Sequence, residues 1–400
     1  NGLEKYPKLR FKGFSEPWTQ VLLSDIFKKS TKKNSDGSIT NVICNSAKNG
    51  LIPQKEYFDK SIANSDNTDG YYIIEQGDFV YNPRKSSDAP YGPVSIYKYP
   101  EHGIVSPLYL CFRALNPVIS SFYNYFFKSP SWHRYIYLSG DSGARHDRVS
   151  IKDEVFFSMP VNIPTEEEQL KIASFLGLIE EKIALQQDLV DNLKKYKRGA
   201  ITLILSNKDA SWKSGRLGDF ITINRGGSPR PIEAFITNDP DGVNWIKIGD
   251  VSEDSLYITQ TAEKITAEGS QKSRKVFAGD LILSNSMSFG RPYIMQIEGC
   301  IHDGWLLLRD DGACFDKKYL CYYLASDEVL AQYKKYAAGS CVSNLNSELV
   351  SNVFIEFPPL EKQKEIASSL ELLDERINCE IKLLDKLLLI KKGLLQSLFI

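Results

Sequence analysis

One stretch of 42 residues occurs twice in this 400-residue chain, and the two copies align without a gap. The copies cover residues 164–205 and 358–399. Gln169 in the first copy matches Gln363 in the second, and the other matched pairs have the same separation of 194 positions. A self-match of this length is typical of a duplicated architecture. The chain is therefore expected to contain two structural repeats.

Both copies are predicted to form long helices. Their apolar residues recur in a 4-3 pattern, which is a heptad seam suited to one partner helix. Thr165 and Glu168 form a predicted capping box after Pro164, and at 1.5 Å per residue each helix would span roughly 60 Å. We expect an antiparallel coiled coil; the alternative is that each helix packs on its own domain. The seam residues of the first copy are Ile172, Leu176, Ile179, Ile183, Gln186, Val190, Leu193, Lys197, Ala200 and Ile204.

Both seams contain polar residues at matching positions, namely Gln186 and Lys197 in the first copy and Glu380 and Lys391 in the second. A polar seam residue lowers stability but specifies alignment. In an antiparallel pair we expect Lys197 to face Glu380 and Gln186 to face Lys391. The alternative is that both lysines extend to solvent.

The repeat extends beyond the two helices. Trp18 and Trp212 have the separation of the helical repeat, and Gly77-Asp78 corresponds to Gly279-Asp280. Short alternating runs and dense turn signals predict an α+β domain with a twisted or barrel-like sheet in each half. The expected domains are residues 1–163 and 207–357, each followed by a long helix, at residues 164–206 and 358–400.

Composition limits the classes of protein that remain. Hydrophobic residues make up 42% of the chain and charged residues 25%, which supports packed cores. A net charge of −1 excludes a generally basic nucleic-acid coat, so any DNA binding must come from local patches. The seven cysteines form no CxxC pair, which favours free thiols in a reducing cytoplasm. There is no signal-peptide h-region and no run of ~18 apolar residues, so we expect no membrane span.

Motifs for catalysis are missing from the sequence. No GxxxxGK[ST] phosphate loop is present, which argues against an ATPase, and GxGxxG is absent too. None of the four histidines pairs with Cys, Asp or Glu at metal-ligand spacing. The adjacent histidine and aspartate of His302-Asp303-Gly304 are residue types found in catalytic sites. A strand-end turn built on Asp-Gly is the simpler interpretation. We therefore predict no catalytic residue and no metal ligand in this chain.

Basic and amide residues occur on loops at matching places in both halves. Arginine, lysine and asparagine are the residue types that phosphates and base edges require. Their recurrence favours a DNA-binding role over the alternative of solvated charged loops. The candidates in the first half are Lys28, Lys29, Lys32, Lys33, Asn82, Arg84, Lys85, Arg145 and Arg148. The candidates in the second half are Arg225, Ser228, Arg230, Lys272, Arg274, Lys275, Asn285, Ser288 and Arg291.

Together these features resemble the specificity subunits of Type I restriction–modification systems, the HsdS family. The resemblance covers nearly the whole chain. It is carried by LRFKGF…W near the start, by P-x-x-E-x-Q-x-x-I-A-x-x-L openings at Pro164 and Pro358, and by K-x-G endings at Lys197 and Lys391. One departure is Ser369, which stands where the first copy has the more apolar Phe175.

The resemblance implies that the two globular halves are target recognition domains and that the helices are the conserved regions between them. It implies a subunit that catalyses nothing and holds no cofactor. Two modification subunits would bring S-adenosylmethionine, and restriction–translocase subunits would bring ATP and Mg²⁺. Each recognition domain would read one half of a bipartite, asymmetric site on double-stranded DNA, and the helix pair would set the spacer.

Two other classes of protein remain as alternatives. A non-catalytic coiled-coil adaptor presenting two binding modules accounts for the helices but not for the recurring basic loops. A fused nuclease–methyltransferase fragment would need catalytic motifs that the chain lacks.

Overall fold

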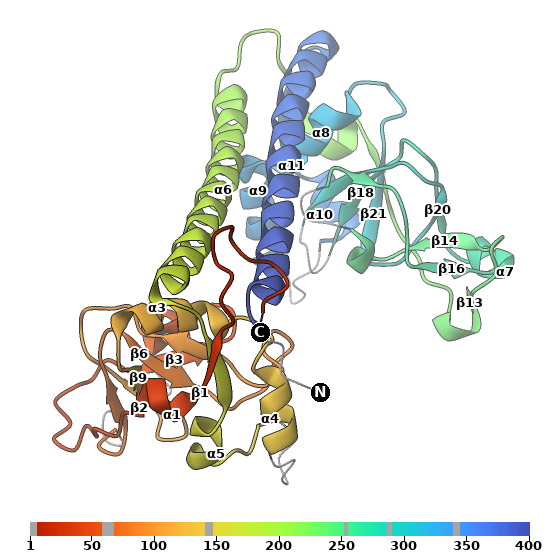
Figure 1. The fold of residues 1–400 in the computed structure, drawn as a ribbon. Helices are drawn as coiled ribbons and strands as arrows, with labels where there is room; N and C mark the ends of the chain where they lie inside the picture. The colour runs from red at the N-terminus through yellow and green to blue at the C-terminus, as the bar shows by residue number, and fades with distance from the viewer. Residues whose placement is uncertain (1–5, 58–67, 141–146, 252–254, 286–289, 339–344) are drawn as a thin grey trace. The chain divides into compact units, whose positions relative to one another are not determined.

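The computed structural model describes residues 6–57, 68–140, 147–251, 255–285, 290–338 and 345–400. The chain forms two compact units: unit 1 comprises Asn1–Gln186 and Leu383–Ile400, and unit 2 comprises Gln187–Lys382. The division falls within two long helices, α6 (Glu166–Ser206) and α11 (Leu360–Ser397), so each unit contains a segment of both (Figure 1). No helix within the described ranges is both long and apolar enough to cross a membrane. The predicted α+β fold with two long helices is confirmed.

Unit 1 contains small antiparallel sheets around an aromatic core. Its four-stranded sheet has the order β2-β9-β6-β7, and β1-β10, β3-β4 and β5-β8 form two-stranded sheets. The ring of Phe27 lies 5.2 Å from the rings of both Phe79 and Phe112, edge to face. The strands are β1 (Thr19–Leu22), β2 (Phe27–Lys29), β3 (Ile43–Ser46), β4 (Gly50–Pro53), β5 (Tyr72–Ile74), β6 (Asp78–Tyr81), β7 (Val94–Ile96), β8 (Gly103–Val105), β9 (Leu110–Ala114) and β10 (Pro160–Ile163). The short helices are α1 (Leu23–Ile26), α2 (Gln54–Tyr57), α3 (Pro117–Phe126), α4 (His133–Ser139) and α5 (Asp153–Phe157).

Unit 2 contains two five-stranded sheets, with the orders β12-β21-β18-β19-β15 and β13-β16-β14-β20-β17, and the pair β11-β22. The pairs β14-β20 and β15-β19 are parallel and the others are antiparallel. The strands are β11 (Lys213–Arg216), β12 (Thr222–Arg225), β13 (Ile236–Thr237), β14 (Val243–Ile246), β15 (Tyr257–Ile258), β16 (Glu263–Ile265), β17 (Arg274–Val276), β18 (Leu281–Ser284), β19 (Pro292–Met295), β20 (Gly299–Ile301), β21 (Trp305–Arg309) and β22 (Phe354–Phe357). The helices are η2 (Leu217–Asp219), η3 (Ile232–Ala234), η4 (Ile248–Asp250), α7 (Ala267–Gln271), α8 (Lys317–Leu324), α9 (Asp327–Ala338) and α10 (Ser347–Ser351).

The repeated Gly-Asp motif forms the same structure in both units. The glycine of Gly77-Asp78 has a φ of 91° and the glycine of Gly279-Asp280 a φ of 88°, a left-handed conformation that favours glycine. The aspartate that follows pairs with an arginine on the neighbouring strand. Arg113 Nε lies 2.7 Å from Asp78 Oδ1, and Arg309 Nη2 lies 2.6 Å from Asp280 Oδ2. The motif therefore combines a turn glycine with a cross-strand ion pair.

A buried carboxylate joins the N-terminal segment to the first long helix. Glu168, in the first turn of α6, accepts hydrogen bonds from Arg10 Nε and Nη2, each at 2.8 Å, and from Trp18 Nε1 at 3.1 Å. Its backbone N–H donates to Thr165 Oγ1 at 3.4 Å, which is one half of the predicted capping box. The other half of a capping box is a hydrogen bond from the N-cap backbone N–H to the Glu168 carboxylate. Here that carboxylate binds Arg10 and Trp18 instead. The LRFKGF…W segment is thus held by the opening of the helical repeat.

Within unit 1, the beginning of α6 and the end of α11 run antiparallel. Leu176 and Leu398 belong to the same core cluster. Lys391 Nζ on α11 lies 2.6 Å from Glu180 Oε1 on α6. We expected Lys391 to face Gln186, so the predicted partner is wrong.

Within unit 2, the end of α6 and the beginning of α11 also run antiparallel. Lys197 Nζ on α6 lies 2.5 Å from Asp374 Oδ1 on α11. We expected Lys197 to face Glu380, which instead pairs with Arg376 on its own helix at 2.6 Å. The predicted register is therefore wrong in this unit as well.

The two errors have one physical cause. Glu180 and Asp374 are matching residues of the repeat, and each directly follows a seam residue, Ile179 or Leu373. That place corresponds to a heptad flank position, where interhelical salt bridges form. Lysine has a long flexible stem, so its ammonium group reaches the flank although its Cα lies in the seam.

A tyrosine of each globular part joins the corresponding ion pair. Tyr125 on α3 donates its hydroxyl to Glu180 Oε2 at 3.3 Å, and Tyr322 on α8 donates to Asp374 Oδ2 at 2.7 Å. In unit 1, Lys128 adds a second ammonium group 2.8 Å from Glu180 Oε1. Each acid therefore connects both long helices to a helix of its own unit.

We predict that Glu180 makes unit 1 sensitive to acid. Burial raises the pKa of Glu180, but Lys128 and Lys391 outweigh it and lower the pKa to about 2. Because an unfolded glutamate has a pKa of about 4.3, the contribution is complete above that pH and is lost as the pH falls towards 2. Glu180→Gln should lower the free energy of unfolding at neutral pH by about 1–3 kcal/mol. Chemical denaturation at pH 7 and pH 3 measures this loss. The exposed Glu181→Gln is the control, and equal effects of both variants would contradict the prediction.

Candidate nucleic-acid interface

In unit 2, one turn collects four of the predicted DNA-binding residues. Asp303 lies in the turn between β20 and β21, and its carbonyl oxygen accepts hydrogen bonds from Arg225 Nε at 3.3 Å and Asn285 Nδ2 at 2.9 Å. Its carboxylate accepts a hydrogen bond from Ser228 Oγ at 2.8 Å and lies 3.5 Å from Arg230 Nη2. Loops that are far apart in the sequence therefore place arginine and amide groups around one turn.

Gly226 allows the first of these loops to reach the turn. A Cβ atom at this position would lie 2.1 Å from the carbonyl oxygen of His302, closer than any real contact. The Gly226 N–H also donates to the carbonyl of Trp305 at 2.8 Å. Only glycine fits this close approach of two backbones, so Gly226 helps to position Arg225 beside it.

The basic run that precedes β17 and enters it lies beside the same loop. Arg274 Nε donates to the carbonyl of Arg225 at 3.2 Å, and Ser273 Oγ donates to the carbonyl of Gly227 at 2.6 Å. Lys275 follows on β17 and is exposed. The structure thus brings Arg274 to the Asp303 cluster, which we define as Arg225, Ser228, Arg230, Arg274, Asn285 and Asp303.

Two other predicted residues of the second half, Lys272 and Arg291, lie outside this cluster. Lys272 Nζ pairs with Glu268 Oε1 at 2.7 Å, within one turn of α7. Arg291 lines a separate cavity in the same unit. Ser288 falls outside the described residues.

The charges in the cluster favour binding rather than catalysis. The hydrogen bond from Ser228 lowers the pKa of Asp303, so this carboxylate stays ionised and pairs with Arg230. Burial lowers the pKa of His302, whose Nδ1 accepts the N–H of Gly304 at 2.8 Å. A neutral, turn-bound histidine agrees with the structural interpretation of His302-Asp303-Gly304. Across the described part of the chain, no group of three His, Cys, Asp or Glu side chains is arranged to hold a metal ion.

In unit 1, two predicted segments meet at one cleft. Asn82, Arg84, Lys85 and Arg148 line a cleft of about 650 Å³ together with Lys48. An antiparallel bridge joins Arg84 to Arg148, and Asn82 Oδ1 accepts the Arg84 N–H at 3.0 Å. The cleft of unit 1 therefore offers the same residue types as the Asp303 cluster of unit 2.

The lysines predicted near the first strand lie elsewhere. Lys28, Lys29 and Lys32 line a different cavity. Lys29 Nζ pairs with Asp153 Oδ2 at 2.6 Å, and Lys33 is not among the residues that line the cleft. Arg145 falls outside the described residues. The structure does not join these lysines to the Asn82 segment.

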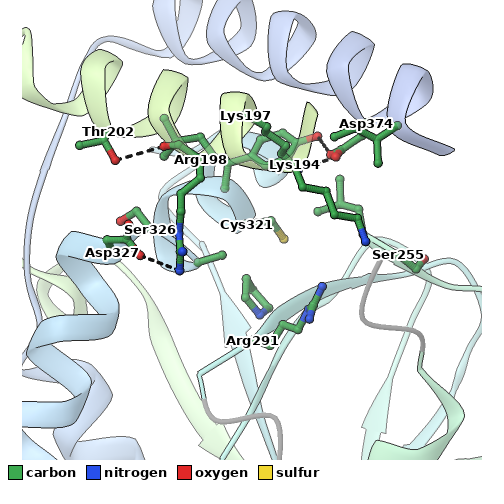
Figure 2. Close-up of a pocket in the computed structure, with 16 residues that line it drawn as sticks. Lys194, Lys197, Arg198, Thr202, Ser255, Arg291, Cys321, Ser326, Asp327 and Asp374 are labelled. Carbon is green, nitrogen blue, oxygen red and sulfur yellow. Dashed lines mark hydrogen bonds and ion pairs between the residues drawn. The ribbon is translucent and has the colours of Figure 1, made fainter. Parts of the chain in front are cut away.

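A further basic cavity lies beside the long helices in unit 2 (Figure 2). It has a volume of about 270 Å³, and Lys194, Lys197 and Arg198 of α6 line it together with Arg291. Figure 2 shows the side chains of Lys194 and Arg198 extending from α6, and that of Arg291 extending from the segment before β19. Arg198 Nη2 also lies 3.2 Å from Asp327 Oδ1 at the start of α9.

Sequence reasoning missed several of the residues that line these sites. Lys48 lies in the turn between β3 and β4, directly before Asn49-Gly50, and a basic residue in a hairpin turn was an available signal. Asp303 was assigned only a turn role. Lys194 and Arg198 flank the seam residue Lys197, and nothing in a helical pattern distinguishes them from other exposed positions.

Comparisons with known proteins give one consistent result. Residues 210–389 match the family model of the Type I restriction modification DNA specificity domain. A curated type I restriction enzyme specificity subunit (MjaX) of Methanocaldococcus jannaschii is 21% identical over 353 residues, which cover 82% of this chain and 78% of that protein.

Two solved structures share the fold. One, from work on complex assembly and conformational transition of the type I R-M system, has a TM-score of 0.63 and 17% identity, covering 94% of this chain and 96% of the other. The Type I restriction–modification S subunit of M. genitalium has a TM-score of 0.54 and 14% identity, and the alignment covers 99% of both chains. At these identities the likeness concerns the fold alone.

We predict that Gly226→Ala destabilises unit 2. The added methyl group would meet the His302 carbonyl, so the loop or the turn must move, at a cost of about 1–3 kcal/mol. Thermal unfolding measures the effect. Gly227→Ala is the matched control, because its nearest atom, the Lys272 carbonyl oxygen, is 4.0 Å away. Equal unfolding temperatures for both variants would show that the close approach does not exist in solution.

Proposed function

We propose that this chain, whose residues 210–389 belong to the family of Type I restriction modification DNA specificity domains, is the specificity subunit of a Type I restriction–modification complex. Each unit would read one half of a bipartite site on double-stranded DNA. The observation that carries the proposal is the recurrence of arginine and asparagine side chains on loops that meet in each unit, around Asp303 and around Asn82. Guanidinium and amide groups are the groups that read guanine and adenine edges.

The geometry supports reading rather than catalysis. The Arg225 and Asn285 side chains are held by the carbonyl of Asp303, so part of the ordering cost of binding is met before DNA arrives. The two clusters differ in sequence, so the two half-sites should differ as well. A coiled-coil adaptor with two binding modules would explain the helices but would not require these recurring clusters.

We infer that the chain itself is not an enzyme and works with partner subunits in the cytoplasm. Two modification subunits would bring S-adenosylmethionine, and restriction–translocase subunits would bring ATP and Mg²⁺. The free cysteines, of which Cys111, Cys300 and Cys321 are buried, are compatible with a reducing compartment.

Exposed apolar side chains on the long helices support assembly with partners. On α6 these are Leu178 (61% exposed) and, seven residues on, Leu185 (63%), and later Tyr196 (64%) and Leu203 (71%) with the same spacing. Leu372 on α11, the repeat equivalent of Leu178, is 66% exposed. Apolar residues at heptad spacing on an exposed helix face are typical of a surface that binds another helix.

The proposal is tested by reconstituting the chain with its modification subunit and measuring binding to DNA. Methylation-sensitive sequencing of a host that carries the system should reveal one bipartite, asymmetric methylated site. Exchange of residues 210–357 for those of another such subunit should change only one half of that site. A methylome that does not depend on this chain would contradict the proposal.

We predict that Arg225→Ala lowers specific DNA affinity of the complex by about 1–3 kcal/mol if the guanidinium reads a guanine edge. If Arg225 contacts a phosphate instead, the variant should bind all DNA sequences more weakly to the same extent. The slope of log Kd against log salt concentration should then fall by about one. Fluorescence anisotropy over a salt series separates these results. Arg216→Ala, on β11 outside the cluster, is the control. Unchanged binding of the Arg225 variant would remove Arg225 from the interface.

We also predict that the helix pair acts as the ruler of the spacer. Insertion of one heptad at matched places in α6 and α11 lengthens each helix by roughly 10 Å. At ~3.4 Å per base pair, the spacer should grow by about three base pairs while both half-sites keep their sequences. Methylome sequencing gives the answer directly. An unchanged spacer would mean that the helices do not set it.

A further inference from the structure

The Asp303 cluster contains one acid among its basic and amide side chains. Arg225, Arg230 and Arg274 of the cluster are exposed, and their guanidinium groups would attract a nearby phosphate. The carboxylate of Asp303 opposes that attraction, because the hydrogen bond from Ser228 lowers its pKa and keeps it ionised. The Asp303 side chain is 40% exposed, so a bound ligand can reach the charge. The cluster thus contains a position that does not suit the DNA backbone.

The turn that carries Asp303 is held in place without the carboxylate. The His302 carbonyl accepts the Trp305 N–H at 3.1 Å, and the Gly304 carbonyl accepts the Asn285 N–H at 2.9 Å. The Gly304 N–H donates to His302 Nδ1 at 2.8 Å. The Asp303 carbonyl accepts hydrogen bonds from two side chains of the cluster. Because these bonds fix the turn, the carboxylate is not needed to form it.

The carboxylate of Asp303 has more acceptor capacity than its described neighbours use. An ionised carboxylate offers about four acceptor sites. Within the described ranges, the side chain that donates a hydrogen bond to it is that of Ser228, whose Oγ lies 2.8 Å from Oδ1. His302 Nδ1 lies 3.6 Å from Oδ1 and already accepts the Gly304 N–H, so it donates nothing to Asp303. The Ser228 bond therefore orients the carboxylate and leaves it able to accept from a ligand.

The ion pair with Arg230 leaves the carboxylate available. Arg230 Nη2 lies 3.5 Å from Asp303 Oδ2, and the Arg230 side chain is 82% exposed. Exposed pairs of this kind contribute little to stability, because water screens both charges. By contrast, Arg309 Nη2 lies 2.6 Å from Asp280 Oδ2, and the Asp280 side chain is only 14% exposed. Arg230 is therefore free to turn to a phosphate when DNA binds, while Asp303 keeps its place on the turn.

A carboxylate within a DNA-binding surface must face a hydrogen-bond donor. Phosphate oxygens, guanine O6 and N7 and thymine O4 are acceptors and would repel it. The donors in the major groove are the exocyclic amines, N4 of cytosine and N6 of adenine. Adenine also presents N7, an acceptor beside its amine, whereas the cytosine edge presents the donor alone. Cytosine N4 is therefore the group that fits the Asp303 carboxylate best.

In unit 1 the matching turn lacks this acid. The segments that end at Arg113 and Arg309 match at a separation of 196 positions, which places Pro107 where unit 2 has Asp303. Both residues lie in the turn before the last strand of their segment. Proline has neither a charge nor a side-chain acceptor, so unit 1 cannot make the same contact at the equivalent position.

We propose that Asp303 is a specificity-determining residue of unit 2, whose carboxylate accepts a hydrogen bond from N4 of a cytosine in the half-site and keeps the DNA backbone away from that point. This inference rests on the proposed DNA-reading function. The half-site read by unit 2 then contains a C·G pair whose cytosine faces the turn between β20 and β21. The arginines of the cluster supply phosphate or guanine contacts, and the acid discriminates between bases.

The first test uses the full chain in complex with its modification subunit. Binding is measured to a duplex that carries the methylated site and to a duplex of unrelated sequence. Asp303→Asn keeps the shape of the side chain and an acceptor for Ser228, but removes the charge. Affinity for the site should fall about five- to ten-fold, because a charge-assisted hydrogen bond becomes a neutral one. Affinity for the unrelated duplex should rise about two- to three-fold, because repulsion of phosphates is lost. Equal changes with both duplexes would overturn the proposal.

A second measurement changes the DNA and leaves the wild-type protein intact. At each cytosine of the unit 2 half-site in turn, 2-pyrimidinone removes the 4-amino group. At one position this should weaken binding of the wild-type complex about 10- to 100-fold more than it weakens binding of Asp303→Ala. The variant corrects for the weakened base pair, because both complexes bind the same duplex. Coupling to an adenine other than the methylated one, tested with purine in its place, or coupling to no base would overturn the assignment to cytosine.

The chain offers two controls. Asp311 follows β21 at its other end and also accepts a hydroxyl group, Thr222 Oγ1 at 3.1 Å, but it lies outside the cluster. Asp311→Asn should change neither affinity. The half-site of unit 1, identified by the exchange of residues 210–357, should be read unchanged by the Asp303 variants. If the wild-type complex prefers no DNA sequence, the proposed function fails. If it prefers one and the Asp303 variants read it unchanged, only the role of Asp303 fails.

Discussion

A lysine placed in an apolar helix seam must find an acid, and this requirement shapes both units. Lys197 and Lys391 interrupt seams that are otherwise largely apolar, and each ammonium group meets a flank carboxylate of the antiparallel helix. A slip of one heptad would place Lys197 opposite Ala367 or Ile381, so both pairs would be lost together. The tyrosines of α3 and α8 donate hydrogen bonds to the same carboxylates. In each unit the ion pair therefore also contacts the globular part. In unit 2 the same pair also lines the basic cavity.

The architecture was largely predictable from the sequence, because repetition and periodicity are local signals. The two long helices and the α+β fold are confirmed, and residues 210–389 match the family model of the Type I restriction modification DNA specificity domain. The Gly-Asp motif proved to be a turn joined to a cross-strand arginine, and the N-terminal motif converges on Glu168. The register was not predictable from the seam alone. Seam periodicity fixes which face of a helix is buried, whereas a lysine stem reaches more than one layer and flank position.

The sequence predicted the residue types of the candidate interface, but only some of the predicted residues come together in the structure. The Asn82 segment and Arg148 are brought together, as are Arg225, Ser228, Arg230 and Asn285. Lys29 instead forms an ion pair with Asp153 of the same unit, because a charged residue on a strand can also pair with a nearby side chain of opposite charge. Asp303 organises the second cluster through a backbone carbonyl, an acceptor that every residue possesses and that no sequence motif marks. Which loops converge depends on strand order, which the sequence did not specify.

Unit 1 is discontinuous in sequence, whereas unit 2 is one continuous segment. During translation the ribosome adds residues from the N-terminus onwards at about 5–20 per second, and domains form as their residues emerge. All of Gln187–Lys382 is therefore available before Leu383–Ile400, which supplies Lys391 and Leu398 to unit 1. The half of the protein that is made first is completed last, because Leu176 lacks Leu398 and Glu180 lacks Lys391 for the whole interval. In the nascent chain, the apolar surface around Leu176 would need to be shielded until Leu383–Ile400 have been made.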